Sequence, residues 1–196
     1  MSIEVISIIF ISYLVGSINF AILISHFKKL PDPRSKGSNN PGATNMFRIG
    51  GKRLATLVLL LDVLKGIIPT WGSYYLGYSP SEIGFVSLAC CIGHMFPIFF
   101  KFKGGKGVAT ALGCLLPIGV SLGFILLSVW ILVFKRTGYS SLAAITSVSL
   151  SPLVTYIIDD KYFLPVLMLA ILVVLRHTPN MMRLLNGTEP KSTQRI

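Results

Sequence analysis

The chain has 196 residues, of which 53% are hydrophobic and only 13% are charged, and its mean hydropathy is +0.72. Soluble domains carry about a quarter charged residues, so this composition excludes an ordinary soluble globular protein. Eighteen Lys and Arg against seven Asp and Glu give a net charge of +11, which in a soluble protein would suggest nucleic-acid binding. Here the basic residues lie between apolar runs, so membrane topology explains the charge and no nucleic-acid partner is expected.

Six apolar runs follow one another along the chain, and about 20 apolar residues are enough for a helix to cross a bilayer. The fourth run is the longest and contains Pro117 and Gly119 near its middle. A single tilted span and a short helical hairpin both fit this run. In chain order the runs are Ile3–Phe27, Leu54–Tyr75, Ile83–Phe100, Gly107–Phe134, Leu142–Ile158 and Tyr162–Leu175.

The distribution of basic residues favours the hairpin, because short cytoplasmic loops are enriched in Lys and Arg. With a hairpin the chain crosses seven times and 16 of the 18 basic residues share one face, whereas six crossings separate Lys135 and Arg136 from the tail. We therefore expect an all-α integral membrane protein of about seven transmembrane helices, some short or broken, in a single domain (1–196). Its N-terminus is expected outside and its C-terminus in the cytoplasm. The shared face holds residues 28–53, 101–106 and 135–136, and Arg176, Arg183, Lys191 and Arg195 of the tail.

The first polar loop, from Ser35 to Arg48, is rich in glycine, hydroxyl and amide residues. Such a loop can turn successive backbone N–H groups toward an anion, whose charge Lys36 and Arg48 would neutralise. The same composition also suits an ordinary polar turn. The loop is therefore a candidate phosphate site, with a plain turn as the alternative.

A second basic and glycine-rich cluster, Lys103-Gly104-Gly105-Lys106-Gly107, ends where an apolar helix is expected to begin. The free N–H groups of that helix N-terminus would face a bound anion. Gly107 stands where a P-loop requires Ser or Thr to hold magnesium, so nucleotide hydrolysis is not expected. A loop whose lysines merely reach the lipid headgroups is the alternative, but that role does not require the glycines.

Asp62 and Lys65 lie three residues apart within the second apolar run, on one helix face. A charge pair inside a membrane is costly unless the partners neutralise each other, so we expect a structural ion pair that faces either the protein interior or the site. His94, at the end of a span beside the glycine cluster, is a candidate general base or a structural histidine. Arg176, His177 and Asn180 follow the last span and could complete an anion site or contact anionic lipid.

In this order and spacing, the motifs resemble the bacterial acyl-phosphate:glycerol-3-phosphate acyltransferases, the PlsY family. The resemblance implies a seven-helix enzyme of the inner membrane that transfers a fatty acyl group from acyl phosphate to the 1-hydroxyl of glycerol 3-phosphate. The products are lysophosphatidic acid and phosphate, and neither cofactor nor metal is expected. The motifs are Gly16-Ser17, residues 38–45, Asp62-x-x-Lys65-Gly66, Gly93-His94-x-x-Pro97, Phe102 to Thr110, and Arg176-His177 through Arg183-Leu184.

The resemblance also implies residue roles. The proton of the glycerol hydroxyl would go to His94 or to a substrate phosphate. No aspartate follows His94 at the spacing of the histidine-x4-aspartate signature of the widespread glycerolipid acyltransferases, so that signature is absent. Glycerol 3-phosphate is expected to bind at Ser38, Arg48, Lys106, His177 and Asn180, in a cradle shaped by Thr44 and Asn45. Acyl phosphate is expected to bind at Lys103, Gly104, Gly105 and Gly107. The expected catalytic residues are His94, Lys106 and Ser141.

Two other classes of function also fit parts of the sequence. A small anion transporter or channel would use one-sided basic loops, an intramembrane Asp62 and Lys65 pair, and spans broken by glycine and proline. A scaffold for other enzymes of phospholipid synthesis would need the bilayer and protein partners but no substrate-binding or catalytic site. The expected partners of an acyltransferase are the bilayer and its two phosphorylated substrates, with contact to other phospholipid-synthesis enzymes left open.

Overall fold

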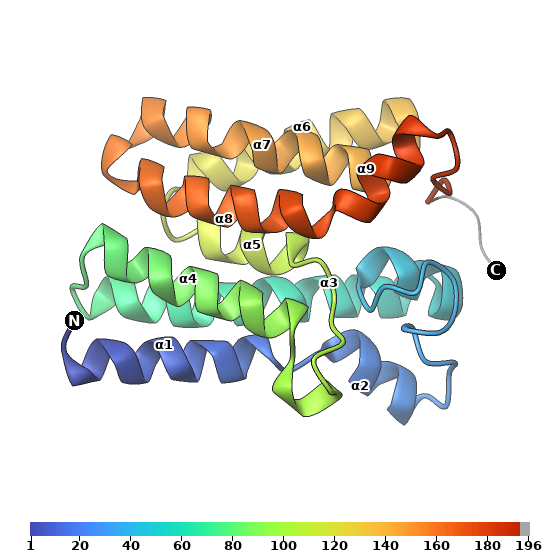
Figure 1. Ribbon diagram of the computed structural model, residues 1–196, viewed down its shortest axis with the longest axis horizontal. Helices are drawn as coiled ribbons and strands as arrows, with labels where there is room; N and C mark the ends of the chain where they lie inside the picture. The colour runs from blue at the N-terminus through green and yellow to red at the C-terminus, as the bar shows by residue number, and fades with distance from the viewer. Residues whose placement is uncertain (193–196) are drawn as a thin grey trace.

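The computed structural model describes residues 1–192, and within this range every regular element is a helix. The long helices run along one axis of the molecule as a bundle (Figure 1), so the predicted all-helical class is confirmed. The helices are α1 (Ile3–Gly16), α2 (Phe20–Phe27), α3 (Ala43–Tyr75), α4 (Pro80–Met95), α5 (Val108–Leu115), α6 (Val120–Thr137), α7 (Ser140–Ile158), α8 (Phe163–Arg176) and α9 (Thr178–Leu185), with short 3-10 turns η1 (Ile98–Phe100) and η2 (Asp160–Tyr162).

The described part of the chain contains five helical segments that are long and apolar enough to cross a membrane. A sixth is added if α8 and α9, which are bent by 56° at His177, count as one broken span. Many apolar side chains of these helices point outward, among them Phe10, Leu60 and Ile157, each more than half exposed. An apolar outer surface of this kind suits lipid rather than water, and the protein is a multi-pass membrane protein.

The run from Gly107 to Phe134 forms two helices. α5 and α6 run in opposite directions and are separated by residues 116–119, which include Pro117 (Figure 1). Proline has no backbone N–H, so the helical hydrogen-bond pattern is interrupted at Pro117. Leu116 before it keeps helical dihedral angles, and the chain becomes extended at Gly119, with φ of −169° and ψ of 118°. α5 has eight residues and is about 12 Å long, which is too short to cross the hydrocarbon core alone. The fourth run is therefore a hairpin with one short arm.

Glycines allow α5 and its neighbours to pack with their backbones in contact. A side chain at Gly66 of α3 would overlap the Thr110 carbonyl oxygen, and one at Gly113 of α5 would overlap the Val63 carbonyl oxygen. Gly16 of α1 lies in the same way against the Cys90 backbone of α4. Small residues let membrane helices approach closely, where many van der Waals contacts can form.

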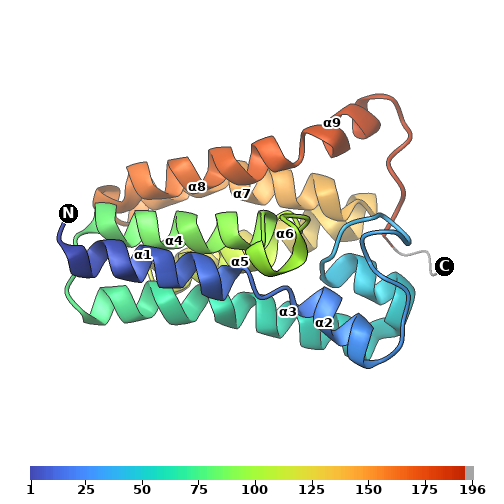
Figure 2. The same ribbon diagram turned by 60° about the horizontal axis from the view of Figure 1, so that its bottom comes forward.

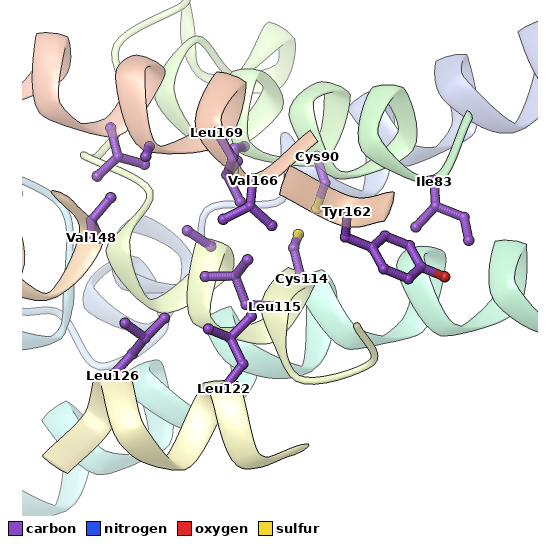
Figure 3. Packing of buried hydrophobic residues seen from close by; sticks show 14 of the residues in the cluster. Ile83, Cys90, Cys114, Leu115, Leu122, Leu126, Val148, Tyr162, Val166 and Leu169 are labelled. Atoms are coloured by element: carbon purple, nitrogen blue, oxygen red, sulfur yellow. The ribbon is translucent and has the colours of Figure 1, made fainter. Parts of the chain in front are cut away.

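The main hydrophobic core lies where α4, α5, α6, α7 and α8 meet. Figure 3 shows Cys90 of α4 and Cys114 of α5 facing each other, with Leu115, Leu122 and Val166 around them. Both cysteines are free and buried. This core holds the short helix α5 in the middle of the bundle, and it thereby sets the position of the loop before α5.

Most of the basic connections gather toward one end of the bundle. α2, the first turns of α3, the connection between α6 and α7, and α9 lie at the end opposite the N-terminus (Figures 1 and 2). η2, which contains Lys161, joins α7 to α8 at the other end of the bundle, where the connection between α3 and α4 also lies (Figure 1). Arg195 of the predicted basic tail falls outside the described residues.

The first polar loop is shorter than the sequence suggests, because α3 already begins at Ala43. Gly51, with φ of 79°, kinks α3 and separates residues 43–50 from the long membrane segment. Thr44 and Arg48 therefore lie on a short helical segment, where an irregular loop was expected. The expectation was wrong here because the glycine and hydroxyl residues that indicate a loop also suit a helix start.

Candidate active site

A cavity of about 410 Å³ lies between helices α3, α5, α6 and α7, near the end of the molecule that carries the basic connections. Its polar lining comes from loops and helix ends, including residues 37–40, 42–44, 106–107 and 140–141, together with His177, Asn180, Arg183, Glu189 and Ser192. The apolar lining comes from positions farther along the helices: Leu59, Leu112, Leu115, Leu126, Leu127, Trp130, Ala144 and Val148. A cavity with one polar and one apolar part suits an amphiphilic molecule.

Three helix N-termini line the polar part of the cavity. α3 contributes residues 42–44, α5 contributes residues 107–109, and α7 contributes Ser140 and Ser141. Thr44 Oγ1 and Ser140 Oγ lie 3.0 Å apart and join the starts of α3 and α7. The first N–H groups of a helix have no partner within the helix and carry partial positive charge. Three such ends around one cavity form a site for an anion such as phosphate.

Three cationic side chains, Arg48, Lys106 and Arg183, also line the cavity. Lys106 precedes Gly107, whose φ of 80° is a conformation that glycine adopts readily, and α5 begins immediately afterwards. Burial lowers the pKa of Lys106 to about 8, because an ammonium group loses hydration there. A bound phosphate would supply the negative charge that keeps this lysine protonated.

The C-terminal segment after α9 folds back over the polar part of the cavity through Glu189. Its Oε1 accepts hydrogen bonds from Ser141 Oγ and Asn180 Nδ2, both at 2.6 Å, and its Oε2 accepts one from Arg183 Nε at 2.7 Å. Burial alone would raise the pKa of Glu189, but these hydrogen bonds outweigh it and the pKa is lowered. The carboxylate therefore stays ionised and connects α7, α9 and the tail.

Backbone contacts also tie this tail to the bundle. Arg48 Nη2 donates to the Lys191 carbonyl oxygen at 3.1 Å, and the Ser192 N–H donates to the Gly138 carbonyl oxygen at 2.9 Å. Sequence reasoning did not find the role of Glu189. The available signal was weak: Glu189 is the only acidic residue after Asp160.

The side chain of Asn45 holds the first polar loop by hydrogen bonds to its backbone. Its Oδ1 accepts from the Ser38 N–H at 2.9 Å, and its Nδ2 donates to the carbonyl oxygens of Pro33 and Lys36 at 3.0 and 2.9 Å. Asn45 is fully buried and is not among the residues that line the cavity. It therefore shapes the loop that presents Ser38.

The glycine-rich loop is attached to the C-terminal end of α4. The Gly104 and Gly105 N–H groups donate to the carbonyl oxygens of Met95 and His94 at 3.2 and 3.0 Å, so neither N–H is available to a substrate. The Gly105 carbonyl oxygen in turn accepts from Arg176 Nε at 3.2 Å. The beginning of the loop thus anchors it, and Lys106 and Gly107 reach the cavity.

His177 lies at the bend between α8 and α9. Its Nδ1 is 2.8 Å from the Val173 carbonyl oxygen, which can only accept, so Nδ1 carries the proton and Nε2 has a lone pair. Of the predicted site residues, Asn45, Lys103, Gly104 and Gly105 do not line the cavity. The structure brings together Ser38, Thr44, Arg48, His94, Lys106, Gly107, Ser141, His177 and Asn180 around it.

Fold and cavity together define a multi-pass membrane protein whose site suits an amphiphile with an anionic head. A sequence model of the glycerol-3-phosphate acyltransferase family matches residues 6–187, and the chain belongs to this family. Relatives named glycerol-3-phosphate acyltransferase include that of Pseudoalteromonas translucida, 56% identical over 92% of this chain and 89% of the relative. The Vibrio cholerae relative is also 56% identical, over 94% and 89%.

Two solved structures of PlsY (YgiH), an integral membrane glycerol 3-phosphate acyltransferase, are similar to this chain over nearly its whole length. The glycerol 3-phosphate form has a TM-score of 0.91 at 37% identity and covers 96% of this chain and 95% of that one. The lysophosphatidic acid form has a TM-score of 0.89 at 36% identity with the same coverage. The predicted resemblance to the PlsY family is confirmed.

Proposed function

We propose that this acyltransferase moves a fatty acyl group from acyl phosphate to the 1-hydroxyl of glycerol 3-phosphate, giving lysophosphatidic acid and phosphate. The observation that carries this proposal is the cavity itself, in which three helix N-termini and three cations adjoin an apolar lining. Both substrates carry phosphate and one carries a long acyl chain. The polar part would bind the phosphates and the apolar part the start of the chain.

In this proposal, Ser38, Arg48, Lys106 and Asn180 bind the phosphate of glycerol 3-phosphate. His177, whose Nδ1 proton is engaged by the Val173 carbonyl oxygen, would accept a hydrogen bond from a glycerol hydroxyl at Nε2. Arg183, which also lines the cavity, adds a cation that the sequence alone did not assign.

Acyl phosphate would bind at Lys106, Gly107 and the N-terminus of α5. Gly104 and Gly105 hold the loop in place through α4, and Ser141 and Thr44 complete the rim. Acyl phosphate is already activated, because phosphate is a good leaving group, so catalysis requires mainly positioning and electrostatic stabilisation. The hydroxyl proton goes either to a substrate phosphate or to His94.

We also propose that the site faces the cytoplasm of a bacterial inner membrane, with seven crossings of the chain, one of which is made by the short helix α5 together with the loop before it. The basic connections gather toward the end of the bundle that contains the cavity (Figures 1 and 2). Lysine and arginine are retained preferentially on the cytoplasmic side. Both proposed substrates would then reach the cavity from the cytoplasm and the inner leaflet.

The decisive experiment is an acyl-transfer assay on the purified protein in lipid nanodiscs. We expect lysophosphatidic acid and inorganic phosphate from acyl phosphate and glycerol 3-phosphate, and no product when acyl-CoA replaces acyl phosphate. The matched control is Lys106→Ala, which removes one cation from the cavity. If wild-type protein forms no more product than this variant, the proposed reaction is wrong; uptake of phosphate into liposomes without acyl transfer would indicate the transporter instead.

A further inference from the structure

Two lysines next to the glycine-rich loop have no place in the cavity. Lys101 and Lys103 do not line it, and both are exposed. Neither ammonium group forms an ion pair or a hydrogen bond within residues 1–192. The two lysines belong to residues 98–103, which comprise η1 and the three residues after it and which we call the aromatic turn. The protein itself supplies no counterion for the charges of this turn.

Three large apolar side chains of the aromatic turn are also exposed. The exposed fractions are 46% for Ile98, 58% for Phe99 and 56% for Phe102. Figure 1 shows the turn, in yellow-green, projecting from the side of the bundle beside the break between α1 and α2. The Ile98 N–H donates at 3.4 Å to Ser17 Oγ in that break. Exposed aromatic groups next to lysines are typical of segments at the boundary between lipid headgroups and acyl chains.

The backbone of the turn is fixed in a conformation that costs energy. Lys101 and Phe102 have φ of 56° and 57°, in the left-handed region that favours glycine. The Phe102 N–H donates at 2.9 Å to the Pro97 carbonyl oxygen, which holds the turn closed. Non-glycine residues in this region occur mainly at functional sites, where surrounding contacts maintain them. A lysine and a phenylalanine at positions that suit glycine indicate that their side chains are used.

The aromatic turn lies at the level of the membrane surface near the cavity. α4, which leads to it, has 16 residues and is about 24 Å long, whereas the hydrocarbon core is about 30 Å thick. A chain that enters the membrane at the start of α4 therefore reaches the opposite interface in the aromatic turn. Side chains exposed at this level meet the headgroups and the first carbons of the acyl chains.

We propose that the aromatic turn binds an anionic phospholipid in the leaflet on the side of the cavity. Phe99 and Phe102 lie among the first acyl-chain carbons, and Lys101 and Lys103 contact the negatively charged headgroup. Anionic lipids attract lysines that lie close to the membrane surface. Lys106 of the cavity follows three residues after the turn, so a lipid bound here holds the glycine-rich loop at the level of the headgroups.

The test places a fluorescent probe in the turn. Phe99→Trp is made in a background with Trp71→Phe and Trp130→Phe, which replace the two native tryptophans and leave a single indole. The protein is reconstituted in phosphatidylcholine vesicles that contain equal fractions of either brominated phosphatidylglycerol or brominated phosphatidylcholine. Bromine quenches the indole on contact, so the difference in quenching measures the preference of the turn for anionic lipid.

We expect both brominated lipids to quench the indole and phosphatidylglycerol to bind about fivefold more tightly, because a lysine near the surface contributes about that much. Lys101→Gln with Lys103→Gln should abolish the preference. Lys135→Gln with Arg136→Gln is the matched control: it removes the same charge from the connection between α6 and α7 and should keep the preference. Absence of quenching, equal binding of the two lipids, or an equal loss in both double variants would overturn the proposal.

A second measurement applies if the single-tryptophan protein does not fold. Native mass spectrometry then compares the phosphatidylglycerol retained by the wild-type protein and by the two double variants. Lower retention in Lys101→Gln with Lys103→Gln alone supports the proposal, and equal retention in all three proteins overturns it. Neither measurement uses a substrate, so absence of acyl transfer would leave this inference standing, and loss of the lipid preference would leave the proposed reaction standing.

Discussion

At the scale of single residues, Lys106 combines a functional position with an altered pKa. It lies in the cavity where the glycine-rich loop meets α5, and burial lowers its pKa to about 8. Below this pH the side chain is charged and can bind phosphate. Above it the free enzyme loses the charge, so binding of glycerol 3-phosphate requires an additional proton.

The lowered pKa predicts that the KM for glycerol 3-phosphate rises about fivefold from about pH 8 to about pH 9. In Lys106→Arg this alkaline rise should disappear, because arginine stays protonated there, although its different shape will raise KM at every pH. Steady-state kinetics across this pH range checks the prediction. Lys103→Arg is the control, since Lys103 does not line the cavity; an unchanged wild-type KM up to about pH 9.5 would contradict the assignment.

Asn45 illustrates how far residue types alone can lead. Its amide in a glycine-rich and serine-rich loop indicated a cradle, and the loop does line the cavity. The sequence could not show that Asn45 points away from the cavity and holds Pro33, Lys36 and Ser38 by hydrogen bonds. That distinction depends on the direction of the Asn45 side chain. The direction is set by the start of α3 at Ala43, two residues before Asn45.

At the scale of elements, the short helix α5 depends on close contact with α3. Gly113→Ala places a methyl group on the Val63 carbonyl oxygen, and separating the two backbones should cost about 1 to 3 kcal/mol, a typical cost of overpacking. We expect a lower midpoint of thermal unfolding in detergent for this variant. Gly72→Ala in α3 is the control, because a side chain there meets nothing within 4 Å, and it should be neutral or slightly stabilising.

The C-terminal tail is the second element with a predicted energetic role. Glu189→Gln replaces a carboxylate that accepts three hydrogen bonds, and hydrogen bonds to charged groups contribute about 2 kcal/mol. The equilibrium population of molecules in which residues 186–192 are detached from the bundle should therefore increase about 30-fold. Hydrogen exchange or proteolysis of the tail measures this population.

Glu82→Gln provides the charge-matched control for the tail, because Glu82 caps α4 in a different part of the chain. Equal exchange in Glu189→Gln and wild type would show that the backbone contacts of Lys191 and Ser192 hold the tail without the carboxylate. Both variants lose one negative charge, so a general effect of net charge would appear in both.

At the scale of the whole molecule, the proposed seven crossings place Lys36 and Lys161 on opposite sides of the membrane. Both side chains are exposed, so Lys36→Cys and Lys161→Cys form a matched pair for labelling. In intact cells an impermeant maleimide should react with the cysteine at 161 and not with the one at 36. Permeabilised cells should label both, and the reverse pattern in intact cells would invert the proposed orientation.

The membrane class could be predicted from the sequence because it depends on composition and on the length of apolar runs, which are local properties. The hairpin in the fourth run was predicted from the distribution of basic residues along the chain, since Pro117 and Gly119 by themselves also fit a single tilted span. Part of the candidate site was also predicted, because Lys106 and Gly107, which line the cavity, belong to a local cluster of glycines and cations.

The tertiary structure decided which of those residues reach one cavity. Packing of the glycine-rich loop against α4 engages the N–H groups of Gly104 and Gly105 in hydrogen bonds, so that a substrate cannot use them. The C-terminal tail folds back and brings Glu189 to Ser141, 48 residues away in the chain. Residue types and their spacing thus determined the membrane class, and they predicted an anion site near the glycine-rich cluster. Contacts between distant segments decided which of those residues line the cavity and which are engaged in hydrogen bonds within the protein. No local sequence pattern records a contact that forms only after the helices pack.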